Sequence, residues 1–330
     1  MTNSANRTTE TPTRIALLGM VEENGHPLSW SAIINGHFDD GIIRAAGLSV
    51  IADYLGAQPA SALGIPGATI THVWCDQPED ARAVAASAKI PHIVANPLEV
   101  IGEVDAVIIP TDKGEEHLER ARPFIEANLP VFIDKPLTIR ADHLDQFIAW
   151  QRAGKRIYSA SAMRFAHEFT SLRDRLPEVG QPRLIVVTGA KSWERYGIHA
   201  LEAVYGLLPP GGWLDACNTG SASANVVHVR HQQSVDVILA INQDMFGGFC
   251  HVTIFGTTGR LDARFRDSFS AFKAQLTAFI DAIRTDADPF DFAQTVEQMA
   301  IIIAAIESRE NDGQRGQIRS FANKQKEVHG

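Results

Sequence analysis

The first half of the chain alternates short apolar segments with amphipathic ones, and this order limits the possible folds more than any other feature. Apolar runs of strand length occupy residues 14–18, 71–76, 104–110 and 131–136. Segments with apolar residues at helical spacing separate most of them. This order is typical of a parallel sheet with helices on both faces. We therefore predict a doubly wound α/β domain over residues 14–140, with its ligands beyond the carboxyl ends of the strands.

The second half has a different pattern. Strand-like runs with turn signals between them occupy residues 183–190, 224–231, 234–244 and 248–256. Helical patterns flank them at residues 198–208, 268–284 and 289–308. This arrangement predicts a second α/β domain over residues 141–330 with an open, mostly antiparallel sheet. Because an open sheet face with apolar residues needs a cover, we expect a homodimer or homotetramer formed through that face.

Two segments depart from this two-domain pattern. Residues 39–69 are rich in Gly, Ala and Pro and are too long for an ordinary connection between elements. We interpret them as an insertion with some helix near the top of the first sheet. Residues 1–13 contain no apolar stretch, which excludes a secretory signal and predicts a disordered tail.

The composition excludes several classes of protein. A formal net charge of −9 argues against a nucleic-acid-binding surface, which needs a basic patch. No apolar run approaches the ~20 residues that a membrane helix requires. Three cysteines, Cys75, Cys217 and Cys250, fit no metal-ligand spacing, so we expect reduced thiols and a cytoplasmic location. The expected partner is a small-molecule substrate.

Residues 131–138, VFIDKPLT, resemble the E-K-P segment of the Gfo/Idh/MocA oxidoreductases, and further segments agree with this family over nearly the whole chain. The similar segments are residues 78–136, 197–208 (GIHALEAVYGLL), 251–261 (HVTIFGTTGRL) and 298–314. Their order and spacing together are specific. The resemblance implies a Rossmann domain followed by an open-sheet domain. It also implies an NAD(P)-dependent reaction on a secondary alcohol of a sugar, polyol or cyclitol-like substrate.

The resemblance also implies roles for individual residues. Lys135 matches the lysine that hydrogen-bonds the reacting oxygen, and His199 matches the histidine used as acid or base. Asp134 stands where the family has Glu near the nicotinamide ribose. Asp76 stands where a carboxylate holds the adenosine ribose, which favours NAD over NADP. Further matching positions are Pro110, Thr111, Lys135 and His117 beside the cofactor, and Arg164, Arg195, Tyr196 and His199 beside the substrate.

The chemistry of alcohol oxidation supports the two catalytic candidates independently. A proton has to leave the oxygen when hydride is transferred, and imidazole titrates near neutral pH. A lysine does the same only if burial or a neighbouring cation lowers its pKa. We therefore expect Lys135 and His199 to meet at one oxygen, with Glu202, at i+3 from His199, orienting the imidazole. Arg195 stands where many relatives carry Asp, which removes the usual Asp-assisted pairing.

The turn after the first strand departs from the usual dinucleotide-binding pattern. Gly19 can serve as its first glycine and Gly25 as its last, but Val21 replaces the middle one. Glu22 and Glu23 add negative charge where a pyrophosphate would lie. At an effective dielectric constant of about 20, two like charges about 4 Å apart cost on the order of 4 kcal/mol, and solvent reduces this.

Three interpretations of this turn stay open. In the first, Glu22 and Glu23 point to solvent and NAD(P) binds. In the second, the dinucleotide is lost, and the protein is a cofactor-free lyase, isomerase or hydrolase, or a non-catalytic ligand-binding protein. In the third, these glutamates and His26 hold a divalent metal, although we assign no metal site. The alternative for His26 is a loop residue that stacks on Pro27 or Trp30, with Ser29 capping the following helix.

Overall fold

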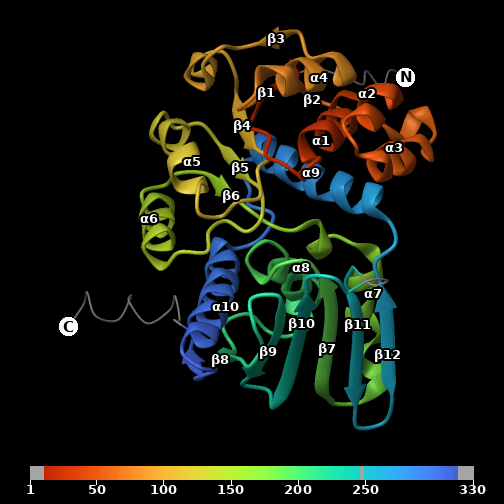
Figure 1. Cartoon of the computed structure of the whole chain (residues 1–330), viewed down its shortest axis with the longest axis vertical. Helices are drawn as coiled ribbons and strands as arrows, with labels where there is room; N and C mark the ends of the chain where they lie inside the picture. Colours follow the sequence, from red (N-terminus) through yellow and green to blue (C-terminus); the bar gives the residue numbers. More distant parts are fainter. Residues whose placement is uncertain (1–10, 246–248, 319–330) are drawn as a thin grey trace, which may run out of the picture.

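The computed structural model describes residues 11–245 and 249–318 and consists of two sheets with their helices (Figure 1). Residues 1–10 of the expected tail lie outside this part, and Thr13 begins the first strand. No helix of the described residues is long and apolar enough to cross a membrane. The three cysteines are free thiols.

The first sheet is fully parallel, with strand order β3-β2-β1-β4-β5-β6. Its strands are β1 (Thr13–Leu18), β2 (Ala68–Trp74), β3 (His92–Ile93), β4 (Ala106–Ile109), β5 (Val131–Ile133) and β6 (Ile157–Tyr158). The connecting helices are α1 (His26–Asn35), α4 (Pro78–Ala88), α5 (His117–Glu126) and α6 (Ala141–Arg152). The strand order reverses at β1, and ligands of doubly wound sheets bind at such a point. The predicted Rossmann-type sheet is confirmed.

The first sheet continues past residue 140, where we expected the domain boundary. Strand β6 pairs with β5 as the last strand of the sheet. Helix α9 (Ser268–Thr285), far along the chain, packs its apolar face into the same core, where Phe279 contacts Phe132 and Tyr158. Figure 1 shows α9 beside α1. The chain therefore returns to the first domain after building most of the second.

The insertion at residues 39–69 contains two short helices and one 3-10 turn. These are α2 (Asp40–Ala45), α3 (Ser49–Gly56) and η1 (Ala60–Ala62). Asp39 caps α2, its side chain accepting a hydrogen bond from the backbone N–H of Ile42 at 3.0 Å. The insertion packs against α1 and reaches the carboxyl ends of β1 and β2, where it becomes part of a cavity described below.

The second sheet has seven strands in the order β12-β11-β7-β10-β9-β8-β13. Its pairs are antiparallel except β7 with β10, so the predicted, mostly antiparallel sheet is confirmed. The strands are β7 (Pro182–Ala190), β8 (Trp213–Asn218), β9 (Ala224–His231), β10 (Val235–Asn242), β11 (His251–Gly256), β12 (Arg260–Arg264) and β13 (Gly316–Gln317). The remaining elements are α7 (His167–Arg175), α8 (Trp193–Tyr205), α10 (Phe292–Glu310), η2 (Pro97–Val100), η3 (Ala162–Arg164) and η4 (Leu176–Val179).

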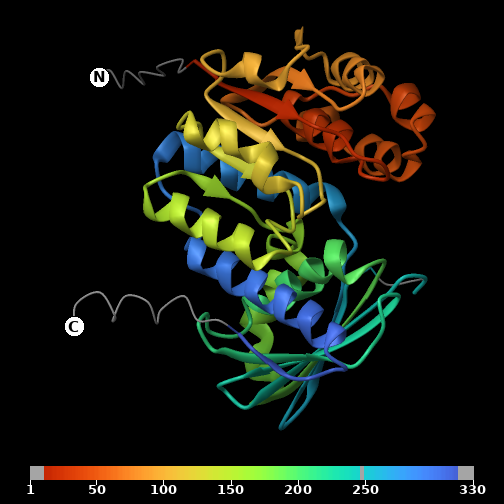
Figure 2. The ribbon, with the colours of Figure 1, turned by 60° about the vertical axis from the view of Figure 1, so that its left-hand side comes forward.

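One face of the second sheet packs on helices, and no element of the described residues covers the other face. Along β10, Val237 and Leu239 are buried, whereas Ile238 and Ala240 on the opposite face are partly exposed. Figure 2 shows α10 on the side of this sheet that faces the first domain. The alternation follows from the period of two along a strand. The open face keeps apolar side chains in contact with solvent.

We expect this open face to hold two copies of the chain together. Val226 and Phe255 lie on it with 40% and 39% of their surfaces exposed. In light scattering at micromolar concentration we expect a dimer or tetramer, and we expect Val226→Asp/Phe255→Asp to give a monomer because two buried charges would oppose association. Leu98→Asp, at an exposed site in η2, is the control and should not change the molar mass. A monomeric wild-type protein would contradict the prediction.

Candidate active site

The turn after β1 keeps glycine where the backbone requires it. Gly19 has a φ of +111°, and a Cβ there would lie 2.8 Å from the Thr111 side chain. A Cβ on Gly25 would lie 2.3 Å from Ile51 of the insertion. Gly19 therefore lets β1 end close to the loop after β4, and Gly25 lets the insertion pack on the start of α1.

A cavity of about 720 Å³ lies at the carboxyl ends of β1 and β2. It is lined by residues 20–24 of the turn, residues 46–48 of the insertion, and acidic and basic side chains from the ends of β2 and the start of α5. Glu22 and Glu23 are exposed and line this cavity. Glu23 has a φ of +64°, a conformation that glycine adopts more readily. The backbone of the turn thus has a conformation typical of glycine at a position that glutamate occupies.

Asp76 lies in this cavity, at the end of β2. Its carboxylate accepts two hydrogen bonds from Arg120, at 2.9 and 3.2 Å, and lies 3.4 Å from the backbone N–H of Met20. Arg120 also donates to Glu116 at 2.8 Å. The positive charge of Arg120 is therefore shared between two carboxylates.

Asn24 and His26 connect the turn to two other strand ends. The Asn24 side chain donates to the carbonyl oxygen of Pro110 at 2.8 Å and accepts from the backbone N–H of His26 at 2.8 Å. The His26 ring lies 2.6 Å, through Nδ1, from the Asp134 carboxylate and stacks on Trp30 with 4.6 Å between ring centroids. His26 stacks on Trp30 as our alternative expected, but it is the first residue of α1 and not part of a loop.

One further side chain differs from the expectation for this region. Ser29 does not cap α1, because its hydroxyl bonds to the hydroxyl of Tyr54 and Gly25 takes the cap position. The other Asp134 oxygen accepts the backbone N–H of Lys135 at 2.7 Å. The described residues contain no group of three or more His, Cys, Asp or Glu side chains placed to hold a metal ion.

Lys135 forms a buried charge cluster with Asp112 and Arg195. The ammonium Nζ of Lys135 lies 3.4 Å from the Asp112 carboxylate, and Arg195 donates to both oxygens of that carboxylate at 2.8 to 3.1 Å. Lys135 and Asp112 are almost fully buried. Burial alone would raise the pKa of Asp112, but the two cations outweigh it and hold this pKa well below its ordinary value.

His199 lies in α8 with its ring buried against Tyr196 and Phe249. Its Nδ1 is 2.6 Å from the hydroxyl oxygen of Ser161, and its ring lies 5.2 Å from Tyr196. Burial and the positive charges of Lys135 and Lys191 hold the pKa of His199 well below its ordinary value. The imidazole is therefore neutral at pH 7.

Lys135 and His199 meet at the same aromatic ring. The ammonium of Lys135 lies 4.9 Å from the centroid of Tyr196, and the His199 ring packs against that ring as well. The tertiary structure thus brings one residue from the end of β5 and two from α8 to one place at the edge of the first sheet.

His117 stabilises the loops around this place. It is fully buried, and its two ring nitrogens lie 2.8 Å from the Thr111 carbonyl oxygen and 2.9 Å from the Pro136 carbonyl oxygen. Burial lowers its pKa. His117 therefore joins the loop after β4 to the loop after β5, which carries Lys135.

Comparison with known proteins finds similar sequences for part of the chain. A family profile described as an oxidoreductase family with an NAD-binding Rossmann fold, GFO_IDH_MocA, matches residues 48–162. The inositol 2-dehydrogenase of Rhodococcus erythropolis is 32% identical over 127 residues, which are 37% of this chain and 36% of that enzyme. The alignment therefore spans about a third of this curated relative.

Solved structures share the fold over nearly the whole chain. Myo-inositol 2-dehydrogenase from Lactobacillus plantarum superposes with a TM-score of 0.74 at 12% identity, covering 94% of this chain and 100% of that one. Scyllo-inositol dehydrogenase from Lactobacillus casei, with NAD(H) and scyllo-inositol bound, gives a TM-score of 0.71 at 14% identity, covering 93% and 99%. The resemblance to the Gfo/Idh/MocA oxidoreductases that the sequence predicted is confirmed over residues 48–162, which match the profile of that family.

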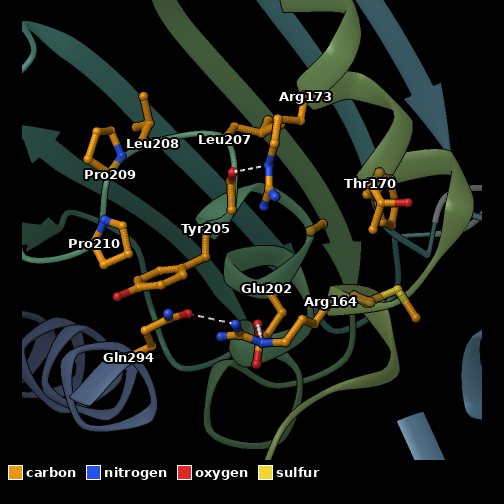
Figure 3. A pocket seen from close by; sticks show the side chains of 14 residues that line it. Arg164, Thr170, Arg173, Glu202, Tyr205, Leu207, Leu208, Pro209, Pro210 and Gln294 are labelled. Carbon is orange, nitrogen blue, oxygen red and sulfur yellow. Dashed lines mark hydrogen bonds and ion pairs between the residues drawn. The ribbon is translucent and has the colours of Figure 1, made fainter. Parts of the chain in front are cut away.

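Among the residues that the Gfo/Idh/MocA resemblance assigned to the substrate, Arg164 lies apart. It pairs with the buried Glu202 at 2.7 Å and donates to Gln294 at 2.8 Å (Figure 3). It lines a separate cavity together with Tyr205, near the end of α8. Within the described residues it bonds to neither Lys135 nor His199, so we leave Arg164 out of the proposed site.

The ion pair between Arg164 and Glu202 also affects which residue orients His199. Glu202 bonds to Arg164 rather than to His199, and Ser161 takes the orienting position instead. Four residues of this region were not predicted from the sequence: Asn24, Asp112, Ser161 and Lys191. Asp112 lies three residues after the end of β4, and this position near a strand end was the one available signal.

Proposed function

We propose that this protein is an NAD(P)-dependent dehydrogenase that oxidises a secondary alcohol of a sugar, polyol or cyclitol-like substrate. The observation that carries the proposal is the meeting of Lys135 and His199 beside Tyr196, at the carboxyl edge of a Rossmann-type sheet. The relatives described above include inositol dehydrogenases, one with NAD(H) and scyllo-inositol bound.

The residues at the first sheet's edge fit a dinucleotide. Gly19 leaves room that a Cβ would fill, and the cavity beside it has the Asp76 carboxylate in reach of a ribose. Asp76 would favour NAD by repelling a 2′-phosphate, because Arg120 is already bound by Asp76 and Glu116. Pro110, Thr111 and Asp134 would lie beside the nicotinamide half.

The side chains of this site can move one proton. Nicotinamide, when bound, would supply the hydride acceptor. Lys135 would donate a hydrogen bond to the substrate oxygen, and Asp112, which Arg195 holds, keeps the Lys135 ammonium in place. When Nδ1 of His199 carries its proton and donates to Ser161, Nε2 is left to accept the proton of the hydroxyl. The lowered pKa keeps the imidazole in this neutral, accepting form.

Calorimetric titration with NAD+, NADH, NADP+ and NADPH tests the proposal. We expect submillimolar binding of NAD+ or NADH to the wild-type protein. Glu22→Gln/Glu23→Gln should tighten binding by up to about tenfold, or about 1.4 kcal/mol, because two exposed negative charges leave the cavity. Glu103→Gln/Glu310→Gln changes the net charge equally at exposed sites away from this cavity and should leave the dissociation constant unchanged.

The same titration separates the dehydrogenase from a cofactor-free enzyme. Binding only after Glu22→Gln/Glu23→Gln would show that charge excludes the pyrophosphate from the natural protein. If the Glu22→Gln/Glu23→Gln variant binds no nucleotide and the further substitution Val21→Gly restores binding, the backbone of the turn is the obstacle. If none of these proteins binds a nucleotide, the proposed function is wrong.

A further inference from the structure

The reacting end of the proposed site carries more positive than negative charge. The ammonium groups of Lys135 and Lys191 lie 4.9 and 4.8 Å from the centroid of the Tyr196 ring, and Arg195 is the residue before that tyrosine. One buried carboxylate, Asp112, pairs with two of these three cations, Lys135 and Arg195. The cluster therefore keeps a positive charge that the buried groups around it do not balance.

The other acidic residues nearby do not remove this excess. Asp134 is bonded to His26 and to the backbone N–H of Lys135. Glu23 acts on Arg195 through its charge, but its side chain is exposed, so solvent screens it. Neither residue forms an ion pair with Lys191.

Lys191 is the cation of this cluster that has no carboxylate partner among the described residues. Its Nζ donates to the hydroxyl oxygen of Tyr196 at 2.9 Å, which holds the ammonium group in place without neutralising it. Lys191 is half-buried and lies two residues before the start of α8, while Lys135 and His199 are buried deeper. A positioned ammonium at the partly exposed end of a site attracts anions.

Given the proposed dehydrogenase function, we propose that the substrate is a hydroxy acid or sugar acid, and that its carboxylate binds at Lys191 and Tyr196. The reacting hydroxyl lies at Lys135 and His199, beside the same Tyr196 ring. Binding the carboxylate at one end sets which hydroxyl of the substrate reaches the proton-accepting residues. A neutral polyol would leave the charge of Lys191 without a partner.

Matched pairs of compounds test this inference by calorimetry with NADH present. The pairs are D-glucose with D-glucuronate, D-galactose with D-galacturonate, and threitol with tartrate. We expect the acid of at least one pair to bind about tenfold or more tightly than its neutral partner. Lys191→Met should remove most of that preference and Lys191→Arg should keep it. Lys89→Met, at an exposed residue after α4, is the control and should not alter the ratio.

The outcomes distinguish this inference from the proposed function. Acids that bind no better than neutral partners in all three pairs overturn the inference, and so does a preference that survives in Lys191→Met. If the protein oxidises the neutral compound of a pair with NAD+ but does not bind the acids, the dehydrogenase function is supported and only the inference of an acidic substrate is contradicted. A preference for acids in a protein that binds no nucleotide supports the carboxylate site and contradicts the dehydrogenase.

Discussion

Lys135→Met is expected to lower kcat by about a hundredfold or more, the range lost when a positioned proton-transfer group is removed. Methionine keeps the apolar stem of the side chain, whereas the ammonium that we propose to bond the reacting oxygen is lost. The fold should persist because Arg195 still holds Asp112 through both carboxylate oxygens. Initial rates of NADH formation at 340 nm and far-ultraviolet circular dichroism measure the two effects.

The matched control for this variant is Lys155→Met. Lys155 bonds to the side chain of Asn128, away from the site, and its loss should leave kcat unchanged. Lys135→Ala should behave like Lys135→Met. Full activity in either Lys135 variant would remove the lysine from the proposed mechanism.

Asp112→Asn is expected to destabilise the protein by roughly 3 kcal/mol, because removing one partner of a buried ion pair leaves the other charges uncompensated. Lys135 is almost fully buried, while Arg195 keeps 25% of its side chain exposed, so the lower end of the usual range applies. Urea unfolding followed by circular dichroism measures the change in free energy.

The effect of Asp112→Asn on the free energy of unfolding should depend on pH in a definite direction. Folding lowers the pKa of Asp112, so its stabilisation is complete above the ordinary value of 3.8 and is lost as the pH falls below it. The destabilisation by Asp112→Asn should therefore be equal at pH 7 and pH 6. Asp105→Asn, which breaks an exposed pair with Arg14, should have a much smaller effect. A similar effect of the two substitutions would show that the buried cluster does not stabilise the fold.

Local patterns in the sequence were sufficient for the architecture and for part of the site. Apolar runs of strand length, separated by helical periodicity, predicted the parallel sheet, and short strands with turn signals predicted the antiparallel one. Because the carboxyl ends of parallel strands lie at one edge, the positions of Gly19, Asp76 and Lys135 along the sequence placed all three at the same edge. These inferences need only hydrogen-bonding geometry and the period of each element.

The partners of the charged residues depended on the tertiary structure. Arg195 bonds to Asp112 across 83 residues, His26 to Asp134 across 108, and Ser161 to His199 across 38. Such pairs have no periodic signal, because they form only when burial removes water from side chains that separate elements bring together. For the same reason, the spacing along α8 predicted that Glu202 would orient His199, but in the folded chain Glu202 forms an ion pair with Arg164. The sequence by itself determined the two sheets and the edge at which the site lies, and the tertiary structure decided which charges meet there.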